Sequence, residues 1–120
     1  MKIAFTVSET DLDSPIDSRF GRAAKFLVYD LVTETFEVVD NQQNLNAAQG
    51  AGIQSAETVA RLGAECLVTG HCGPKAFRVL NAAGVKVYTT EATTAAEALE
   101  QFRLGNLTPS TSADKDGHWA

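Results

Sequence analysis

Five short runs of apolar and β-branched residues are separated by polar, turn-rich segments along the chain. Their lengths and composition are typical of β-strands. Only a short polar turn separates the second run from the third, which predicts an antiparallel hairpin. The five predicted strands are residues 2–7, 26–31, 36–40, 65–69 and 85–88.

Three later segments change from a period of two residues to the 3.6-residue period of an amphipathic helix. Pro74 stands at the first position of the second segment, where proline is favoured because a helix leaves that N–H without a partner. Thr94 and Glu97 have the spacing of a capping box at the start of the third. Each predicted helix ends at a glycine suited to a left-handed stop, namely Gly63, Gly84 and Gly105.

The remaining segments are polar and lack a periodic apolar face. Residues 8–21 form an unusually long loop, which we expect to be functional and mobile without ligand, and residues 22–25 add one helical turn. Residues 41–49 form a second polar loop, rich in Asn and Gln. Residues 106–120 contain no period and are predicted to be a flexible tail. A single domain over residues 1–105 follows.

The element order is strand, hairpin, helix, strand, helix, strand, helix. The first strand pairs with the hairpin on one side, and right-handed crossovers place the last two strands on the other side. This predicts an α/β fold with a five-stranded mixed sheet in the order 3-2-1-4-5, strand two antiparallel and helices on both faces. That arrangement is typical of a ribonuclease-H-like fold.

Four of these strands run in the same direction, so their carboxyl ends share one edge of the sheet. Ligands of open α/β sheets bind at such an edge, where the winding reverses beside the first strand. The sequence therefore predicts that the functional site is formed by residues 8–25, 41–52, 71–74 and 89–93.

The overall charge of the chain limits the classes of ligand that we expect it to bind. The 120 residues carry a formal net charge of −5, and the ten Lys and Arg are scattered among fifteen acids. A general nucleic-acid binder would show a basic stripe, so this class is not favoured. The sequence shows neither a secretory signal nor an apolar run long enough to span a membrane, and we expect a cytoplasmic monomer. Cys66 and Cys72 are then expected to be thiols, because that compartment is reducing.

The segment Gly70-His71-Cys72-Gly73-Pro74 combines an imidazole, a thiol and two glycines at the start of a helix. Helix N-terminal N–H groups favour anions, and the glycines let a ligand approach the backbone. A second helix start follows the GAG motif at residues 50–52. Cationic side chains can be added from both neighbouring segments: Arg19, Arg22 and Lys75. Together these groups predict a cradle for a compact polyanion.

Other interpretations of the same residues remain open. Arg19 and Arg22 could instead pair with acids of the first loop, as surface ion pairs often do. Cys72 could be a small apolar side chain and no ligand. Two Cys and two His, with His118 far along the chain, do not supply a four-ligand zinc site. The sequence also lacks a Ser-His-Asp elbow and a C-x-x-C pair, so catalysis is not expected.

Four motifs are familiar: DSRFGRA at residues 17–23, GAG at 50–52, TGHCGP at 69–74 and AGVKVY at 83–88. Together they resemble the dinitrogenase iron–molybdenum cofactor biosynthesis family over residues 1–105. The resemblance implies a ribonuclease-H-like fold and non-catalytic carriage of a preformed metal–sulfur cluster. The closest similarity is to members whose cluster is a molybdenum–copper sulfide; the alternative is an iron–molybdenum–sulfur cluster.

One position departs from the family pattern, because many relatives have His where this chain has Arg19. If that histidine is a metal ligand in those relatives, this chain binds through charge, or through His71 and Cys72 as metal contacts. A cluster that brings its own sulfides needs cations and amides more than protein ligands, which fits the molybdenum–copper cluster better.

We therefore expect a cluster carrier that works with partner proteins. The residues expected to contact the cluster are Arg19, Phe20, Arg22, His71, Cys72, Gly73 and Lys75. The competing hypotheses are a thiol-dependent enzyme that uses Cys72 and a protein-interaction module that uses the first loop.

Overall fold

The computed structural model describes residues 1–41 and 51–110 and contains one five-stranded mixed sheet. The strand order is β3-β2-β1-β4-β5. β2 is antiparallel to both of its neighbours, whereas β1, β4 and β5 are parallel to one another. The predicted order and the antiparallel hairpin are confirmed. The strands are β1 (Lys2–Val7), β2 (Lys25–Asp30), β3 (Thr35–Asp40), β4 (Cys66–Thr69) and β5 (Lys86–Thr89).

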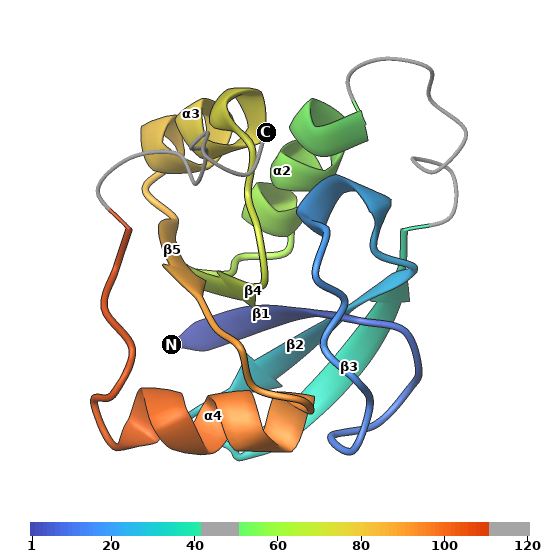
Figure 1. Cartoon of the computed structure of the whole chain (residues 1–120), viewed down its shortest axis with the longest axis vertical. Coiled ribbons are helices and arrows are strands. Elements are labelled where there is room, and N and C mark those ends of the chain that lie inside the picture. The colour runs from blue at the N-terminus through green and yellow to red at the C-terminus, as the bar shows by residue number, and fades with distance from the viewer. Residues whose placement is uncertain (42–50, 111–120) are drawn as a thin grey trace.

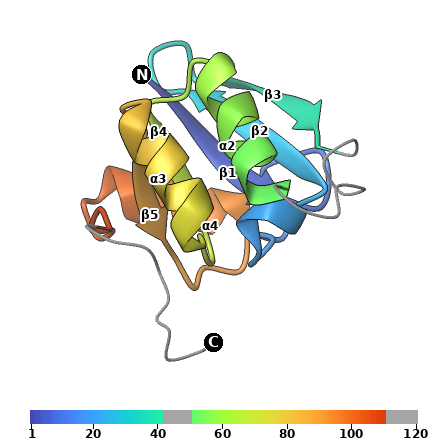
Figure 2. The ribbon, with the colours of Figure 1, turned by 90° about the horizontal axis from the view of Figure 1, so that it is seen from above.

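Three α-helices cover the two faces of the sheet (Figure 1). They are α2 (Ala51–Arg61), α3 (Pro74–Ala82) and α4 (Ala95–Arg103). Helices α2 and α3 lie side by side on one face, and α4 lies on the other (Figure 2). Among the described residues, no helix combines the length and the apolar character that crossing a membrane requires.

The alternation of side chains along β1 divides the core into two parts. Ala4 faces the first core cluster, in which α2 and α3 pack on the sheet. Ile3, Phe5 and Val7 point the other way, into the second core cluster beneath α4. All four are fully buried. A one-residue shift of β1 would exchange the two sets, so this pattern fixes its register.

The turn between β2 and β3 is stabilised by the side chain of Asp30, which binds backbone N–H groups of the turn. Its carboxylate accepts hydrogen bonds from the N–H groups of Val32 at 2.8 Å and Thr33 at 3.3 Å. These two bonds hold the pKa of the Asp30 carboxyl below its ordinary value. Glu34 has a φ of 60°, in the left-handed region, where the chain reverses.

The predicted helical turn at residues 22–25 is wrong in position. A short 3₁₀ helix, η1, occupies Phe20–Arg22 instead, and β2 begins at Lys25. Phe20 is only 2% exposed and packs near Phe26, so burial of its ring places the turn earlier. Lys25 is already paired with Asp40 of β3, with 2.7 Å between its Nζ and a carboxylate oxygen.

The end of the described chain returns to the sheet. Pro109 forms a bridge with Tyr88, and the N–H of Ser110 donates to the carbonyl oxygen of Val87 at 2.7 Å. The packed region therefore continues past the predicted boundary at residue 105. The rest of the predicted tail, residues 111–120, and the predicted polar loop after Asn41 lie outside the described residues.

The two cysteines are not joined in a disulfide, and each belongs to a different part of the core. Cys66 starts β4 on the α4 side and is 3% exposed. Burial raises the pKa of the Cys66 thiol, because the thiolate is poorly solvated there, while a hydrogen bond from Tyr88 acts in the opposite direction. Cys72 lies on the opposite side, in the first core cluster.

Candidate functional site

Buried hydrogen bonds tie the carboxyl ends of β1 and β4 to the first loop. The Thr6 hydroxyl donates to the carbonyl oxygen of Asp17 at 2.8 Å, and it lies 2.9 Å from the Thr69 hydroxyl, to which it is also hydrogen bonded. Both threonines are fully buried. The Asp17 N–H donates back to the carbonyl oxygen of Thr6 at 2.8 Å. The loop therefore leaves the sheet edge in a defined direction.

The next residues pair with the loop that follows β4. Arg19 forms a parallel bridge with His71, and the Phe20 N–H donates to the His71 carbonyl oxygen at 3.2 Å. A Cβ on Gly70 would lie 2.7 Å from the Ser18 Cα, closer than real contacts allow. Glycine at position 70 is therefore required for the two loops to meet, and the predicted convergence of these segments is confirmed.

The first loop is anchored more firmly than its sequence suggests. The N–H groups of Ala95 and Ala96, at the start of α4, donate to the carbonyl oxygens of Ser14 and Leu12 at 2.9 and 2.8 Å. The N–H of Ile16 donates to the carbonyl oxygen of Thr93 at 2.9 Å. The loop thus caps a helix with its own backbone. This network argues against the expected mobility, because the backbone supplies the anchors that a periodic apolar face would otherwise supply.

One cavity, which we call the basic pocket, opens between η1, the start of α2 and the start of α3. It has a volume of about 450 Å³. Arg19 and Lys75 contribute cations, and Phe20, Pro74 and Ala76 form an apolar wall. Its described lining contains no Asp or Glu. The lining residues are Arg19, Phe20, Gly21, Gly52, His71, Gly73, Pro74, Lys75 and Ala76.

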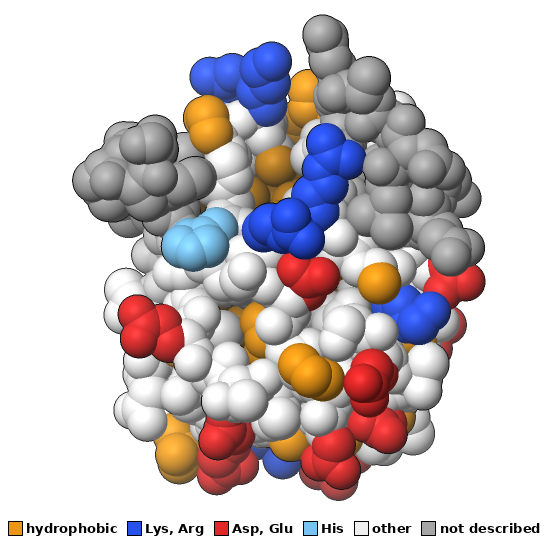
Figure 3. Space-filling model, turned by 45° about the vertical axis from the view of Figure 1, so that its right-hand side comes forward, with side chains coloured by type: hydrophobic (Ala, Val, Ile, Leu, Met, Phe, Trp, Pro, Cys, Tyr) orange, Lys and Arg blue, Asp and Glu red, His pale blue; other side chains and the backbone are white. Residues whose placement is uncertain are grey.

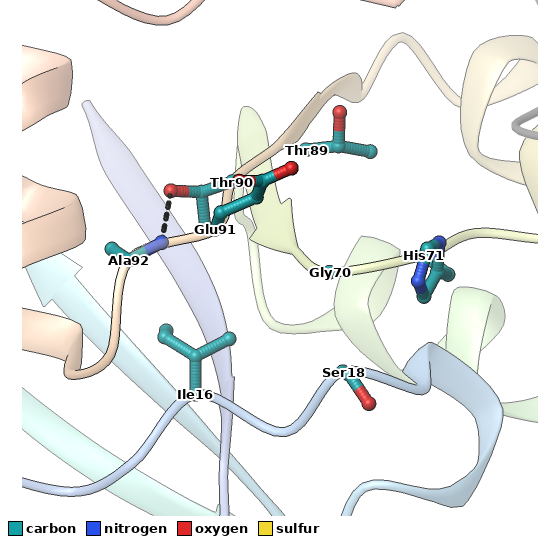
Figure 4. Close-up of a pocket in the computed structure, with 8 residues that line it drawn as sticks. All are labelled: Ile16, Ser18, Gly70, His71, Thr89, Thr90, Glu91 and Ala92. Carbon is teal, nitrogen blue, oxygen red and sulfur yellow. Dashed lines mark hydrogen bonds between the residues drawn. The ribbon is translucent and has the colours of Figure 1, made fainter.

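A second cavity, which we call the hydroxyl pocket, lies on the other side of His71 and has a volume of about 500 Å³ (Figure 4). Glu91 supplies its one carboxylate, and no Lys or Arg is among the described residues that line it. The Thr90 hydroxyl accepts a hydrogen bond from the Ala92 N–H at 3.0 Å. The lining residues are Ile16, Ser18, Gly70, His71, Thr89, Thr90, Glu91 and Ala92.

The surface is electrostatically divided around this edge of the sheet. Figure 3 shows Lys and Arg side chains gathered around an apolar hollow, with a histidine beside them. Most of the acidic side chains visible on this face lie in its other half. An anion that approaches this face is therefore attracted to the half that contains the hollow.

Five of the seven predicted contact residues line the basic pocket: Arg19, Phe20, His71, Gly73 and Lys75. Arg22 lies on η1 beside them but is not among the described lining residues. Cys72 is 1% exposed and packs in the first core cluster with Phe20 and Leu80. The structure therefore places the Cys72 thiol among apolar side chains, and a ligand in the pocket would not meet it without a rearrangement.

Sequence reasoning missed several residues of this edge. Ser18 was given no role, and Gly70 was expected to let a ligand approach the backbone, whereas its close approach to Ser18 joins the two loops. Thr89, Thr90 and Glu91 fell in a segment expected at the edge but were given no role. The usable signal was their position at and directly after the end of β5, because residues at the carboxyl end of a parallel strand lie at the crevice.

The donor set around the basic pocket favours an anion over a bare cation. No three His, Cys, Asp or Glu side chains among the described residues are arranged to hold a metal ion. The pocket offers instead two cationic side chains, an imidazole and glycine backbone at the start of α3. An anion with a polarisable surface suits this pocket, because its charge can be bound by the cations while the rest of its surface packs against the apolar side chains.

Three proteins illustrate what this chain is similar to. The apo form of the orange protein from Desulfovibrio gigas superposes with a TM-score of 0.92 and is 42% identical, covering 95% of this chain and 96% of that one. A NifB-like protein from Thermotoga superposes with a TM-score of 0.84 at 35% identity, covering 97% and 98%. An uncharacterised protein of Methanocaldococcus jannaschii is 31% identical over 110 residues, 89% of each chain.

The family comparison covers the same region as the predicted domain. The model of the family described as dinitrogenase iron-molybdenum cofactor matches residues 1–105. These residues include every element from β1 to α4 and both pockets. The family resemblance found in the motifs is thereby confirmed, and the chain belongs to the dinitrogenase iron-molybdenum cofactor family.

Proposed function

We propose that this protein binds and carries a preformed molybdenum–copper sulfide cluster in the basic pocket, without catalysing a reaction. The observation that carries the proposal is the composition of that pocket: Arg19 and Lys75 stand beside an apolar wall, with no acid among the described lining residues. Membership of the cofactor family and the similarity to the orange protein support a cluster as the ligand.

A sulfide-rich cluster matches these groups physically. It is anionic, so the guanidinium and ammonium groups can make charge-assisted hydrogen bonds to it. Its sulfide surface is weakly hydrated, so the ring of Phe20 and the methyl group of Ala76 can pack against it. Its metals are already coordinated, so the protein does not have to supply a ligand set. The N–H of Gly73 and the N–H groups that follow Pro74 in the first turn of α3 add donors.

The alternatives receive less support. An iron–molybdenum–sulfur cluster fits the family and would use the same groups. A thiol-dependent enzyme would need an accessible nucleophile, whereas Cys72 is 1% exposed. The backbone of the first loop is engaged in capping α4, so an interaction module would have to use the exposed side chains of this loop. We further propose a cytoplasmic monomer that meets partner proteins, and a ribonuclease-H-like classification on the basis of the strand order.

The test is titration of the protein with a preformed molybdenum–copper sulfide cluster, followed by visible absorbance at low and high salt. Charge-assisted hydrogen bonds contribute about 1.5–3 kcal/mol each, so Arg19→Ala with Lys75→Ala is expected to lower affinity about a hundredfold or more. The remaining binding should depend less on salt, because fewer charges are involved.

The matched control is Arg61→Ala with Lys86→Ala, which removes the same charge from residues that do not line the basic pocket. This control should keep most of the affinity. Equal losses in the two double variants would show that only net charge matters, and an unchanged affinity in Arg19→Ala with Lys75→Ala would place the cluster elsewhere.

A further inference from the structure

Two sulfur atoms lie close together at the edge of the sheet opposite the basic pocket. Cys66 is the first residue of β4 and is paired with Ile3 of β1, so it lies near the start of the chain. Its Sγ is 3.9 Å from the Sδ of Met1. The basic pocket, in contrast, lies beyond the carboxyl ends of these strands. The sulfur pair is thus separate from the site already described.

A cavity of about 210 Å³ opens beside the two sulfurs. Met1, Cys66, Tyr88 and Phe102 line it, with Glu65, Gly84 and Lys86 at its remaining walls. Met1 is 47% exposed, whereas Cys66 is 3% exposed, so the thioether lies on the solvent side of the thiol. An ion could therefore reach Cys66 past the Met1 side chain without opening the core.

The spacing of the sulfurs suits a single bridging ion. With metal–sulfur bonds of about 2.3 Å, two sulfurs 3.9 Å apart subtend an angle of about 116° at the metal. That value is close to the angle of a three-coordinate centre. The third position would face the cavity, where the Tyr88 hydroxyl, a hydrogen-bond partner of Cys66, or an external ligand can reach it.

The donor types decide which ion fits. A thiolate and a thioether are soft ligands, and this combination selects Cu(I) among common biological metals. Zinc fills four positions in structural sites, and the described residues do not gather three His, Cys, Asp or Glu side chains in one place. Calcium and magnesium require oxygen ligands. A low-coordinate monovalent ion is therefore the one that two sulfurs can hold.

We propose that Cys66 and Met1 form a binding site for one Cu(I) ion at the amino-terminal edge of the sheet. This site goes beyond the proposed cluster carriage and does not depend on it. The Cys66 thiol donates a hydrogen bond to the Met1 thioether, and a Cu(I) ion bound between the two sulfurs would take the place of that proton.

The site is tested with the whole chain, produced without an added N-terminal segment so that Met1 keeps its place. Anaerobic competition with the Cu(I) chelator bicinchoninate should show one equivalent bound per chain. Cys66→Ala should weaken Cu(I) binding by more than about a hundredfold, since first-sphere ligands matter at least as much as their supports. The matched control, Cys72→Ala, should keep wild-type affinity. Equal affinity in Cys66→Ala and the wild type would overturn the site.

A second measurement holds even if Cys66→Ala fails to fold. Met1 is the single methionine of the chain, so selenomethionine labelling introduces one selenium atom at one place. X-ray absorption at the copper edge should then show one selenium and one sulfur neighbour. Copper bound with sulfur but no selenium neighbour would exclude the Cys66–Met1 pair. Cluster titration of the same samples is a separate readout, because the basic pocket contains neither residue.

Discussion

The basic pocket and the hydroxyl pocket share His71 and the same pair of loops, yet they offer opposite chemistry. The basic pocket is completed by helix starts and by η1, which bring Arg19 and Lys75 together. The hydroxyl pocket is completed by the end of β5, which contributes Thr89, and by the segment after it, which contributes Glu91. Topology thus selects the edge of the sheet, but the element that closes each pocket decides which ligand it can take.

The two pockets also differ in how they are supported. Phe20 and Ala76 of the basic pocket belong to the first core cluster, so its wall is continuous with the hydrophobic core. Ile16 and Ala92 of the hydroxyl pocket only pack against the edge of the second cluster. A rigid wall favours a preorganised site, because less conformational freedom is lost when the ligand binds.

The largest expected effect tests whether the wall of the basic pocket contributes more to the hydrophobic core than the wall of the hydroxyl pocket does. Phe20→Ala should lower the free energy of unfolding by about 3–5 kcal/mol, because it removes a buried ring from a packed cluster. Ile16→Ala, in the hydroxyl pocket, should cost less, because Ile16 is only partly buried. Urea denaturation of both variants measures the difference. Equal losses would contradict the view that only the basic pocket is built on the core.

The buried hydrogen bond between Thr6 and Thr69 joins the carboxyl ends of β1 and β4, from which the loops of both pockets extend. Thr6→Val should destabilise the fold by about 1–3 kcal/mol, because buried polar groups lose their partner. The double variant Thr6→Val with Thr69→Val should cost less than the sum of the two single changes. A double-mutant cycle by denaturation measures this coupling, and strict additivity would show that the two hydroxyls act independently.

Substitutions of Cys72 distinguish the stability of the core wall from the charge-dependent binding of the cluster. Cys72→Ser should lower the free energy of unfolding by about 1–3 kcal/mol, because a hydroxyl is costly in an apolar cluster. Cluster affinity should change little, since Cys72 does not line the pocket. Cys72→Ala is the control without a polar atom. Loss of cluster absorbance in both variants, with the fold intact, would establish the thiol as a ligand.

The smallest expected effect is that of Glu91 on cluster binding. Glu91→Gln removes the one carboxylate of the hydroxyl pocket without changing the shape of the side chain. The affinity of the basic pocket for an anionic cluster should rise, but by less than about fivefold, because exposed charges interact weakly through water. The gain should vanish at high salt. Glu57→Gln on α2 is the control, and a larger gain there would show that proximity to His71 is irrelevant.

Much of the fold could be predicted because local patterns and pairing rules agree. The short turn between the second and third strands and the right-handed rule for crossover connections were sufficient for the strand order. The position of η1 could not be predicted, because it depends on the burial of Phe20 against Phe26, a contact between segments that the local pattern does not specify. The anchoring of the first loop was missed for a similar reason. Its hydrogen bonds to α4 are made by backbone groups, which are the same for nearly all residue types, so the sequence does not reveal them.

For the candidate site, the sequence by itself determined which residue types were available and to which edge they belong. Arg19, His71 and Lys75 could be assigned to that edge because strand direction follows from the element order. Only the tertiary structure decided that the Cys72 thiol turns into the core while the backbone of Gly73 faces the pocket. The reason is physical: within one short loop, packing against distant side chains sets the orientation of each residue, and that packing exists only once the chain has folded.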